Sequence, residues 1–203
     1  MLKLATTFAA LVLALPPQLR VLDARQAISF FIDDGNGVPG YRDTDRELAR
    51  MAFTAWSRES NGRLKFTESK QREGALIRLR WISPAGGLYG ETQSIEVNGK
   101  AGAVVYVMPQ VSVQGEPLAS RAVQDGLLRD TIVYLTCVHE LGHAVGLGHT
   151  SKFDDIMYYF GYGGDILNYF MRYRNKLQSR DDIARYSGLS AGDVEVLHGK
   201  YHE

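Results

Sequence analysis

The run from His139 to His149 constrains this chain more than any other feature. Its sequence, HELGHAVGLGH, has histidines at the first, fifth and eleventh positions, a glutamate at the second and a glycine at the eighth. Three of the five histidines in the chain therefore lie within this run. Histidines scattered through a core or over a surface would not follow such a spacing, so the run predicts one shared site.

The spacing fits a single metal ion. Residues four apart leave the same face of a helix about one turn apart, so His139 and His143 can reach a common ion. Gly146 can adopt a positive φ and end the helix, which turns His149 back towards that ion. Three neutral imidazoles leave the fourth tetrahedral position for water, as in a catalytic zinc site. Glu140 is then the predicted general base that takes a proton from the water.

The bulk composition excludes several classes of function. The 23 basic residues balance the 23 acidic ones, so no strong field favours nucleic acid or anionic lipid. A length of 203 residues suits one globular domain, which we expect to be a monomer. Beyond the N-terminal segment, no stretch is long and apolar enough to predict a membrane span.

The first residues are typical of a secretory signal peptide. Lys3 precedes an apolar run over residues 4–15, which Pro16 and Pro17 end, and this run is too short to span a bilayer. We assign residues 1–24 to the signal, with cleavage after Ala14 or Ala24, and residues 25–203 to the catalytic domain. The alternative is an N-terminal core helix. The signal predicts a secreted protein, extracellular or periplasmic.

Hydrophobic periodicity along the chain predicts an α+β domain. A capping box at Thr44-Asp45-Arg46-Glu47 predicts a helix that ends at Asn61-Gly62. A second helix is expected to run from about Gly126 into the histidine motif. A third, over 165–177, is either a lid over the substrate pocket or a helix packed on the domain. Alternating apolar residues predict strands over residues 26–33, 64–66, 76–81 and 103–108.

The motif, followed by Thr150 and then by Asp155-Ile156-Met157-Tyr158, resembles the catalytic domain of matrixins, the matrix metalloproteinase branch of the metzincins. The resemblance implies a zinc endopeptidase with a twisted, mostly parallel sheet, a backing helix, an active-site helix and a C-terminal helix. It also implies that Met157 forms a hydrophobic floor, the Met-turn, beneath the ligands. An extended polypeptide substrate would lie beside an edge strand, which we place at 103–108.

Near the end of the chain, Asp193 has two interpretations. The stretch from Leu189 to Val194 is similar to the start of the last matrixin helix, where an aspartate supports the Met-turn. Ser190 and Asp193 also have the spacing of a helix N-terminal cap, and capping alone would explain the aspartate.

The chain departs from the matrixin pattern in several places. No histidine precedes His139, so the second, structural zinc of animal matrixins is not expected. The cysteine-bearing propeptide is also missing, because the only cysteine, Cys137, lies on another face of the motif helix. Calcium loops are not recognisable, and a solvated acidic loop is favoured over a weak calcium site at Asp33, Asp34, Asp43 and Asp45.

Tyr159 raises a second family-level alternative. Its position two residues after Met157 resembles the astacin and serralysin branches, where a tyrosine contacts zinc or the tetrahedral intermediate, whereas matrixins usually have proline there. A phenol at that place could donate to a developing oxyanion. Alternatively, Tyr159 lines the pocket wall with its aromatic neighbours. A different class, a non-catalytic zinc module that binds a partner, is disfavoured because structural zinc needs no Glu140.

Overall fold

The computed structural model describes residues 21–84 and 89–201. The cleavage point predicted after Ala14, and the signal segment up to residue 20, lie outside these residues. No helix in the described part of the chain combines the length and apolar character that a membrane span requires.

Five strands form one mixed sheet in the order β2-β1-β3-β5-β4. Four strands run parallel to their neighbours, and β4 alone pairs antiparallel, with β5. The α+β class and the mostly parallel sheet with an edge strand are therefore confirmed. The strands are β1 (Ile28–Ile32), β2 (Phe66–Glu68), β3 (Ile77–Trp81), β4 (Gly90–Val97) and β5 (Lys100–Val107).

The predicted edge strand at 103–108 was wrong. That segment forms most of β5, which pairs with β3 on one side and with β4 on the other. Asn98 and Gly99 both have positive φ, 51° and 75°, as a tight hairpin turn requires. This turn folds β4 back along the outer side of β5, so β4 is the antiparallel edge.

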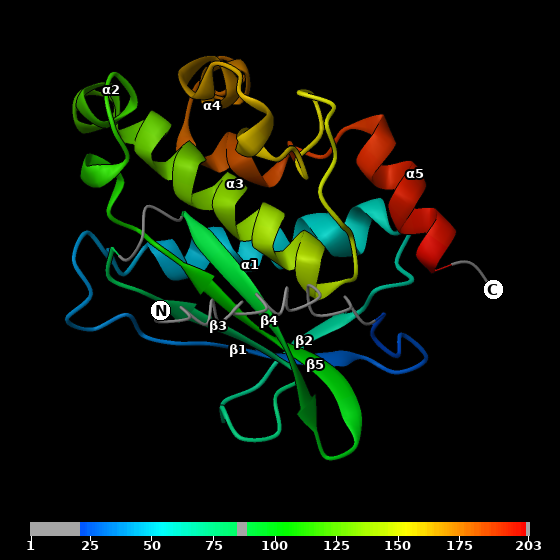
Figure 1. Ribbon diagram of the computed structural model, residues 1–203. Coiled ribbons are helices and arrows are strands. Elements are labelled where there is room, and N and C mark those ends of the chain that lie inside the picture. Colours follow the sequence, from blue (N-terminus) through cyan, green and yellow to red (C-terminus); the bar gives the residue numbers. More distant parts are fainter. Residues whose placement is uncertain (1–20, 85–88, 202–203) are drawn as a thin grey trace, which may run out of the picture.

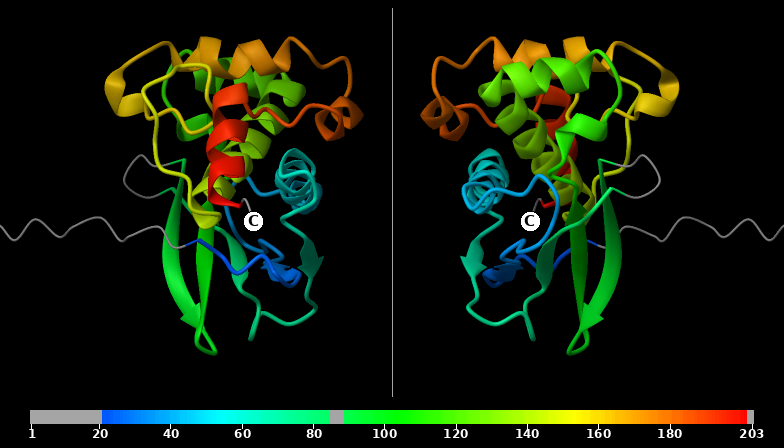
Figure 2. Two further views of the ribbon diagram at one scale, coloured as in Figure 1. Left: turned by 90° about the vertical axis from the view of Figure 1, so that its right-hand side faces the viewer. Right: turned by 90° about the vertical axis from the view of Figure 1, so that its left-hand side faces the viewer.

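The helices gather on one side of the sheet (Figures 1 and 2). α3 crosses above the sheet and packs against α1, where the Trp56 indole donates to the Val138 carbonyl at 2.9 Å. The predicted helix over 165–177 is α4, and its buried face is aromatic, which agrees with a packed helix. The helices are α1 (Asp45–Glu59), α2 (Leu118–Gln124), α3 (Gly126–Ala144), α4 (Ile166–Arg174) and α5 (Ala191–Lys200).

The predicted capping box at the start of α1 was also wrong. The Thr44 side chain makes no capping hydrogen bond, and its backbone is already helical. Arginines from distant segments form ion pairs with the two acidic side chains of this turn. Glu47 pairs with Arg180 at 2.6 Å, and Asp45 is buried in an ion pair with Arg129 of α3. The Asp45 carboxylate also accepts a hydrogen bond from the N–H of Arg42 at 2.9 Å, so this turn combines a local contact with long-range charge pairs.

Candidate active site

The active-site helix, α3, is fixed at both ends. At its start the Asp125 carboxylate accepts hydrogen bonds from the N–H groups of Leu127 and Leu128, which satisfies donors that no helical carbonyl can reach. After its end at Ala144, Gly146 has a φ of 92°, the left-handed conformation that the sequence predicts. The chain turns there and brings His149 back over the helix.

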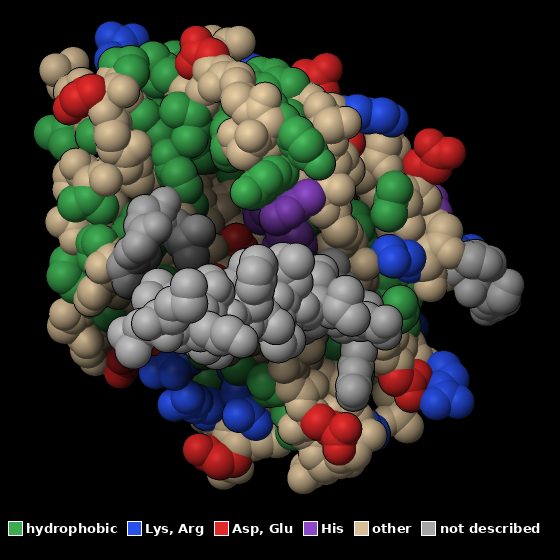
Figure 3. Space-filling model, in the orientation of Figure 1, with side chains coloured by type: hydrophobic (Ala, Val, Ile, Leu, Met, Phe, Trp, Pro, Cys, Tyr) green, Lys and Arg blue, Asp and Glu red, His purple; other side chains and the backbone are tan. Residues whose placement is uncertain are grey.

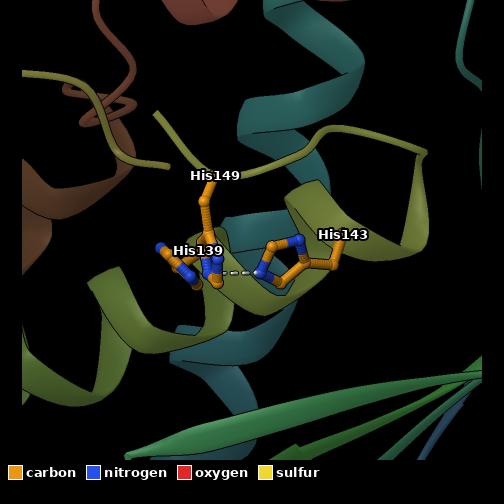
Figure 4. A group of neighbouring side chains, drawn as sticks. All are labelled: His139, His143 and His149. Atoms are coloured by element: carbon orange, nitrogen blue, oxygen red, sulfur yellow. Dashed lines mark hydrogen bonds between the residues drawn. The ribbon is translucent and has the colours of Figure 1, made fainter. Parts of the chain in front are cut away.

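The three motif histidines converge (Figure 4). Their metal-binding atoms all lie within 4.8 Å of one another, and the Nε2 atoms of His143 and His149 are 3.1 Å apart. A tetrahedral zinc site with bonds of about 2.0–2.1 Å needs its nitrogens about 3.3 Å apart. The trio therefore fits a catalytic zinc ion with only small adjustments. Figure 3 shows histidine surface within a hollow near the middle of this face.

Hydrogen bonds orient two of the imidazoles for metal binding. His139 Nδ1 lies 2.6 Å from the Ile156 carbonyl oxygen, and His143 Nδ1 lies 2.9 Å from that of Leu147. A carbonyl oxygen can only accept, so both Nδ1 atoms carry the proton and both Nε2 atoms offer a lone pair. Zinc-binding histidines use backbone carbonyls in this way to fix tautomer and ring orientation.

The electrostatic setting keeps the trio neutral. Burial lowers the pKa of His139 to about 3. Burial also lowers the pKa of His143 and that of His149. Neutral imidazole is the form that binds a metal, so these nitrogens need not lose a proton first.

Met157 lies directly beneath the motif helix. It is fully buried, and a Cβ built on Gly142 would lie 2.3 Å from its sulfur and 3.0 Å from the Trp56 ring. Gly142 occupies one of the variable positions of the H-E-x-x-H motif. The close approach of Met157 and Trp56 explains why a glycine is found there.

Gly142→Ala should therefore destabilise the domain, although alanine is the better helix former. Overpacking against Met157 and the rigid indole costs about 1–3 kcal/mol, while the helix gains about 1 kcal/mol. We expect a net loss of up to about 2 kcal/mol in the free energy of unfolding, measured by urea titration. Gly199→Ala in α5, where nothing lies within 4 Å, should leave stability unchanged or raise it. Equal effects of the two substitutions would contradict the packing argument.

Asp193 contacts both the segment that contains Met157 and the start of α5. Its carboxylate accepts hydrogen bonds from the N–H groups of Ile156 at 2.7 Å and Met157 at 3.3 Å. The same side chain completes a capping box with Ser190 at the start of α5. Because the Ile156 carbonyl orients His139, Asp193 also supports the peptide group that positions this histidine.

Tyr159 lies against the third histidine. Its ring stacks on that of His149, with centroids 4.9 Å apart and an angle of 24°, and nearly half of the residue, 48%, is exposed. The backbone of Tyr159 donates to the Thr150 carbonyl at 3.2 Å, which ties the segment after Met157 to the segment after His149. The ring is thus at the metal site and beside solvent.

Glu140 is buried next to the trio, with 6% of its surface exposed. Burial raises the pKa of its carboxyl to about 7, and a hydrogen bond from Thr92 opposes that shift. Neither Thr92 nor Gly90, two residues before it on β4, was identified from the sequence. Gly90 and Thr92 are two residues apart, so they lie on the same face of a strand. This spacing could have pointed to Glu140 only if β4 had been recognised as the edge strand next to the motif helix.

Two of the acidic residues that offered a weak calcium site as the less favoured alternative have other partners. Asp33 pairs with Arg80 at 3.2 Å, and Asp45 is buried against Arg129. Within residues 21–84 and 89–201, the histidine trio is the one group of His, Cys, Asp or Glu side chains placed to hold a metal. Cys137 is buried, and burial raises the pKa of its thiol, in agreement with an inert core side chain.

A helix that carries HExxH and a third histidine beyond a glycine turn, set over a mostly parallel sheet, belongs to the zinc metallopeptidases. The family model for matrixins, peptidase family M10, matches residues 24–185, and the chain belongs to the matrixin family of zinc metalloendopeptidases. No curated protein sequence matched the chain.

Proposed function

We propose that this matrixin domain is a secreted endopeptidase in which His139, His143 and His149 hold one zinc ion and Glu140 is the general base. The observation that carries the proposal is the convergence of three imidazoles whose ligand atoms lie within 4.8 Å of one another, with a buried glutamate directly after the first of them in the chain. A structural zinc site has no use for such a carboxylate, which argues against a non-catalytic zinc module.

The residues then divide the reaction between them. Zinc bound by the trio would supply Lewis-acid activation of water and of the scissile carbonyl. Glu140 takes a proton from the attacking water and passes it to the leaving amine nitrogen. Asp193 and Met157 support the segment beneath the three histidines. Gly146 provides the turn that brings His149 back towards His139 and His143. No covalent bond to the enzyme forms.

The substrate is an extended polypeptide that pairs with the outer edge of β4. Unpaired N–H and C=O groups on an edge strand can bind another chain by strand addition, with side-chain pockets giving selectivity. Cleavage of casein or gelatin in the presence of zinc tests the proposal. A chelator should abolish the cleavage and added zinc should restore it. Zinc binding without any cleavage would favour the non-catalytic module.

Tyr159→Phe separates the two interpretations of this tyrosine. Phenylalanine keeps the ring that stacks on His149 and loses only the hydroxyl. We expect kcat to stay within about twofold, because removing a single transition-state donor costs about 100-fold or more. A loss of that size would instead assign the phenol to oxyanion stabilisation, as in the astacin branch.

The N-terminal segment supports export, and one contact helps to choose between the two cleavage points. The N–H of Leu22 donates to the Tyr201 hydroxyl at 3.3 Å, and Leu22 is buried in the core. Cleavage after Ala24 would remove this contact, so we place the cut after Ala14. N-terminal sequencing of exported protein should then begin at Leu15. A start at Arg25, or retention inside the producing cell, would contradict this assignment.

A further inference from the structure

The edge strand β4 presents two residues to the carboxylate of Glu140. Residues two apart on a strand share a face, and Gly90 and Thr92 both face α3. The Thr92 hydroxyl lies 2.8 Å from Oε2 of Glu140 and 2.8 Å from its backbone carbonyl oxygen. A Cβ built on Gly90 would lie 2.6 Å from Cγ of Glu140 and 2.8 Å from Oε1.

These contacts fix a side chain that is otherwise flexible. The Thr92 hydroxyl has one proton, which it can share between two acceptors of the same residue, so this contact ties the backbone and the carboxylate of Glu140 to β4. Among the described residues, Oε2 has Thr92 as its donor and Oε1 has none. At Gly90 the strand lacks the side chain that would occupy the space of the carboxylate.

The register of β4 sets this arrangement. Gly90 pairs with Val107 and Thr92 with Val105 of β5, both of which are fully buried. A shift of one residue would turn Thr92 away from the helix and bring Glu91, an exposed carboxylate, to face Glu140. The core side chains of β5 therefore determine which strand residue reaches the glutamate.

We propose that Thr92 is a positioning residue for the general base. It holds Oε2 so that Oε1 remains free to accept the proton of the attacking water, and Gly90 provides the room for this orientation. The inference rests on the proposed role of Glu140. Thr92 acts through the glutamate and does not itself touch the reacting atoms.

Thr92→Val and Thr92→Ser test the hydroxyl against the rest of the side chain. Valine keeps the shape and loses the hydrogen bond, whereas serine keeps the hydroxyl and loses a methyl group. A hydrogen bond to a charged group is worth roughly a 10- to 100-fold change. We expect Thr92→Val to lower kcat by about that factor on a fluorogenic peptide, with KM within twofold and zinc content unchanged. Thr92→Ser should retain most of the kcat.

Thr54→Val is the matched control, because the exposed Thr54 hydroxyl bonds only the Arg50 carbonyl of its own helix. It should leave kcat unchanged. Wild-type kcat in Thr92→Val would overturn the inference. An equal loss in Thr92→Ser would also overturn it, because the effect would then come from the methyl group.

A measurement independent of turnover separates this inference from the proposed function. In a double-mutant cycle, Thr92→Val should lower Tm more in the native background than in Glu140→Ala, which has no carboxylate to hold. Equal shifts in Tm would refute the contact. Non-additive shifts in a zinc-loaded protein that cleaves no peptide would leave the contact standing and refute the protease function.

Discussion

Glu140→Ala should lower kcat by about 1,000-fold while zinc remains bound. General acid–base catalysis contributes roughly 10²–10⁴-fold, and this buried carboxylate is the proposed proton carrier between water and the leaving amine. The measurement is steady-state cleavage of a quenched fluorogenic peptide, with zinc content determined on the same samples. Because the ligands are untouched, loss of activity with full zinc content would assign the defect to chemistry and not to metal loss.

The control for this substitution is Glu195→Ala, which removes an exposed glutamate from α5. It should leave both kcat and zinc content at wild-type values. Activity in Glu140→Ala equal to that of the native protein would refute the enzyme proposal as a whole, because Glu140 is its only proposed proton carrier.

Asp45→Ala should cost about 3–5 kcal/mol in the free energy of unfolding. Asp45 and Arg129 join α1 to α3, and their side chains are 0% and 3% exposed. The guanidinium also donates to the Gly40 carbonyl at 2.7 Å, so it cannot move out to water without breaking other bonds. Removing Asp45 takes away the main partner of a buried guanidinium and leaves it only Asp130, at 3.3 Å, as a counter-charge, which explains the large effect.

Unfolding in guanidinium chloride measures this loss of stability. The concentration of free zinc is held constant, because a bound ligand also stabilises the folded state. Asp154→Ala breaks a pair with Arg172 in which the aspartate side chain is 91% exposed, and it should cost about 0–1 kcal/mol. A loss below about 1 kcal/mol in Asp45→Ala would show that the buried pair is dispensable.

The metal site was predictable because its determinants are local. His139 and His143 share one helix face by spacing alone, and Gly146 adopts the positive φ that its place in the motif predicts. The five fixed positions of the motif therefore encode the convergence without any knowledge of the sheet. The positive φ values at Asn98 and Gly99 follow from a local signal as well, because Asn-Gly between two strands favours a tight hairpin turn.

Features that depend on distant partners were not predictable. The capping box at Thr44 was not formed because Thr44 is already helical, and the two acidic side chains of that turn also pair with Arg129 and Arg180, far along the chain. The edge strand was misplaced because a turn signal does not say on which side of β5 the strand β4 pairs. The contact of Thr92 with Glu140 joins residues 48 positions apart, so it depends on sheet order and register together.

The most direct test of the account is the zinc stoichiometry of the purified chain. Elemental analysis after zinc supplementation and removal of free metal should find one zinc per chain. The ion should be lost in each of His139→Ala, His143→Ala and His149→Ala. His198 lies outside the trio, and its ring bonds the Glu59 carbonyl. The variant His198→Ala should therefore retain the zinc ion. A native protein without stoichiometric zinc, or full zinc content in any variant of the trio, would contradict the account.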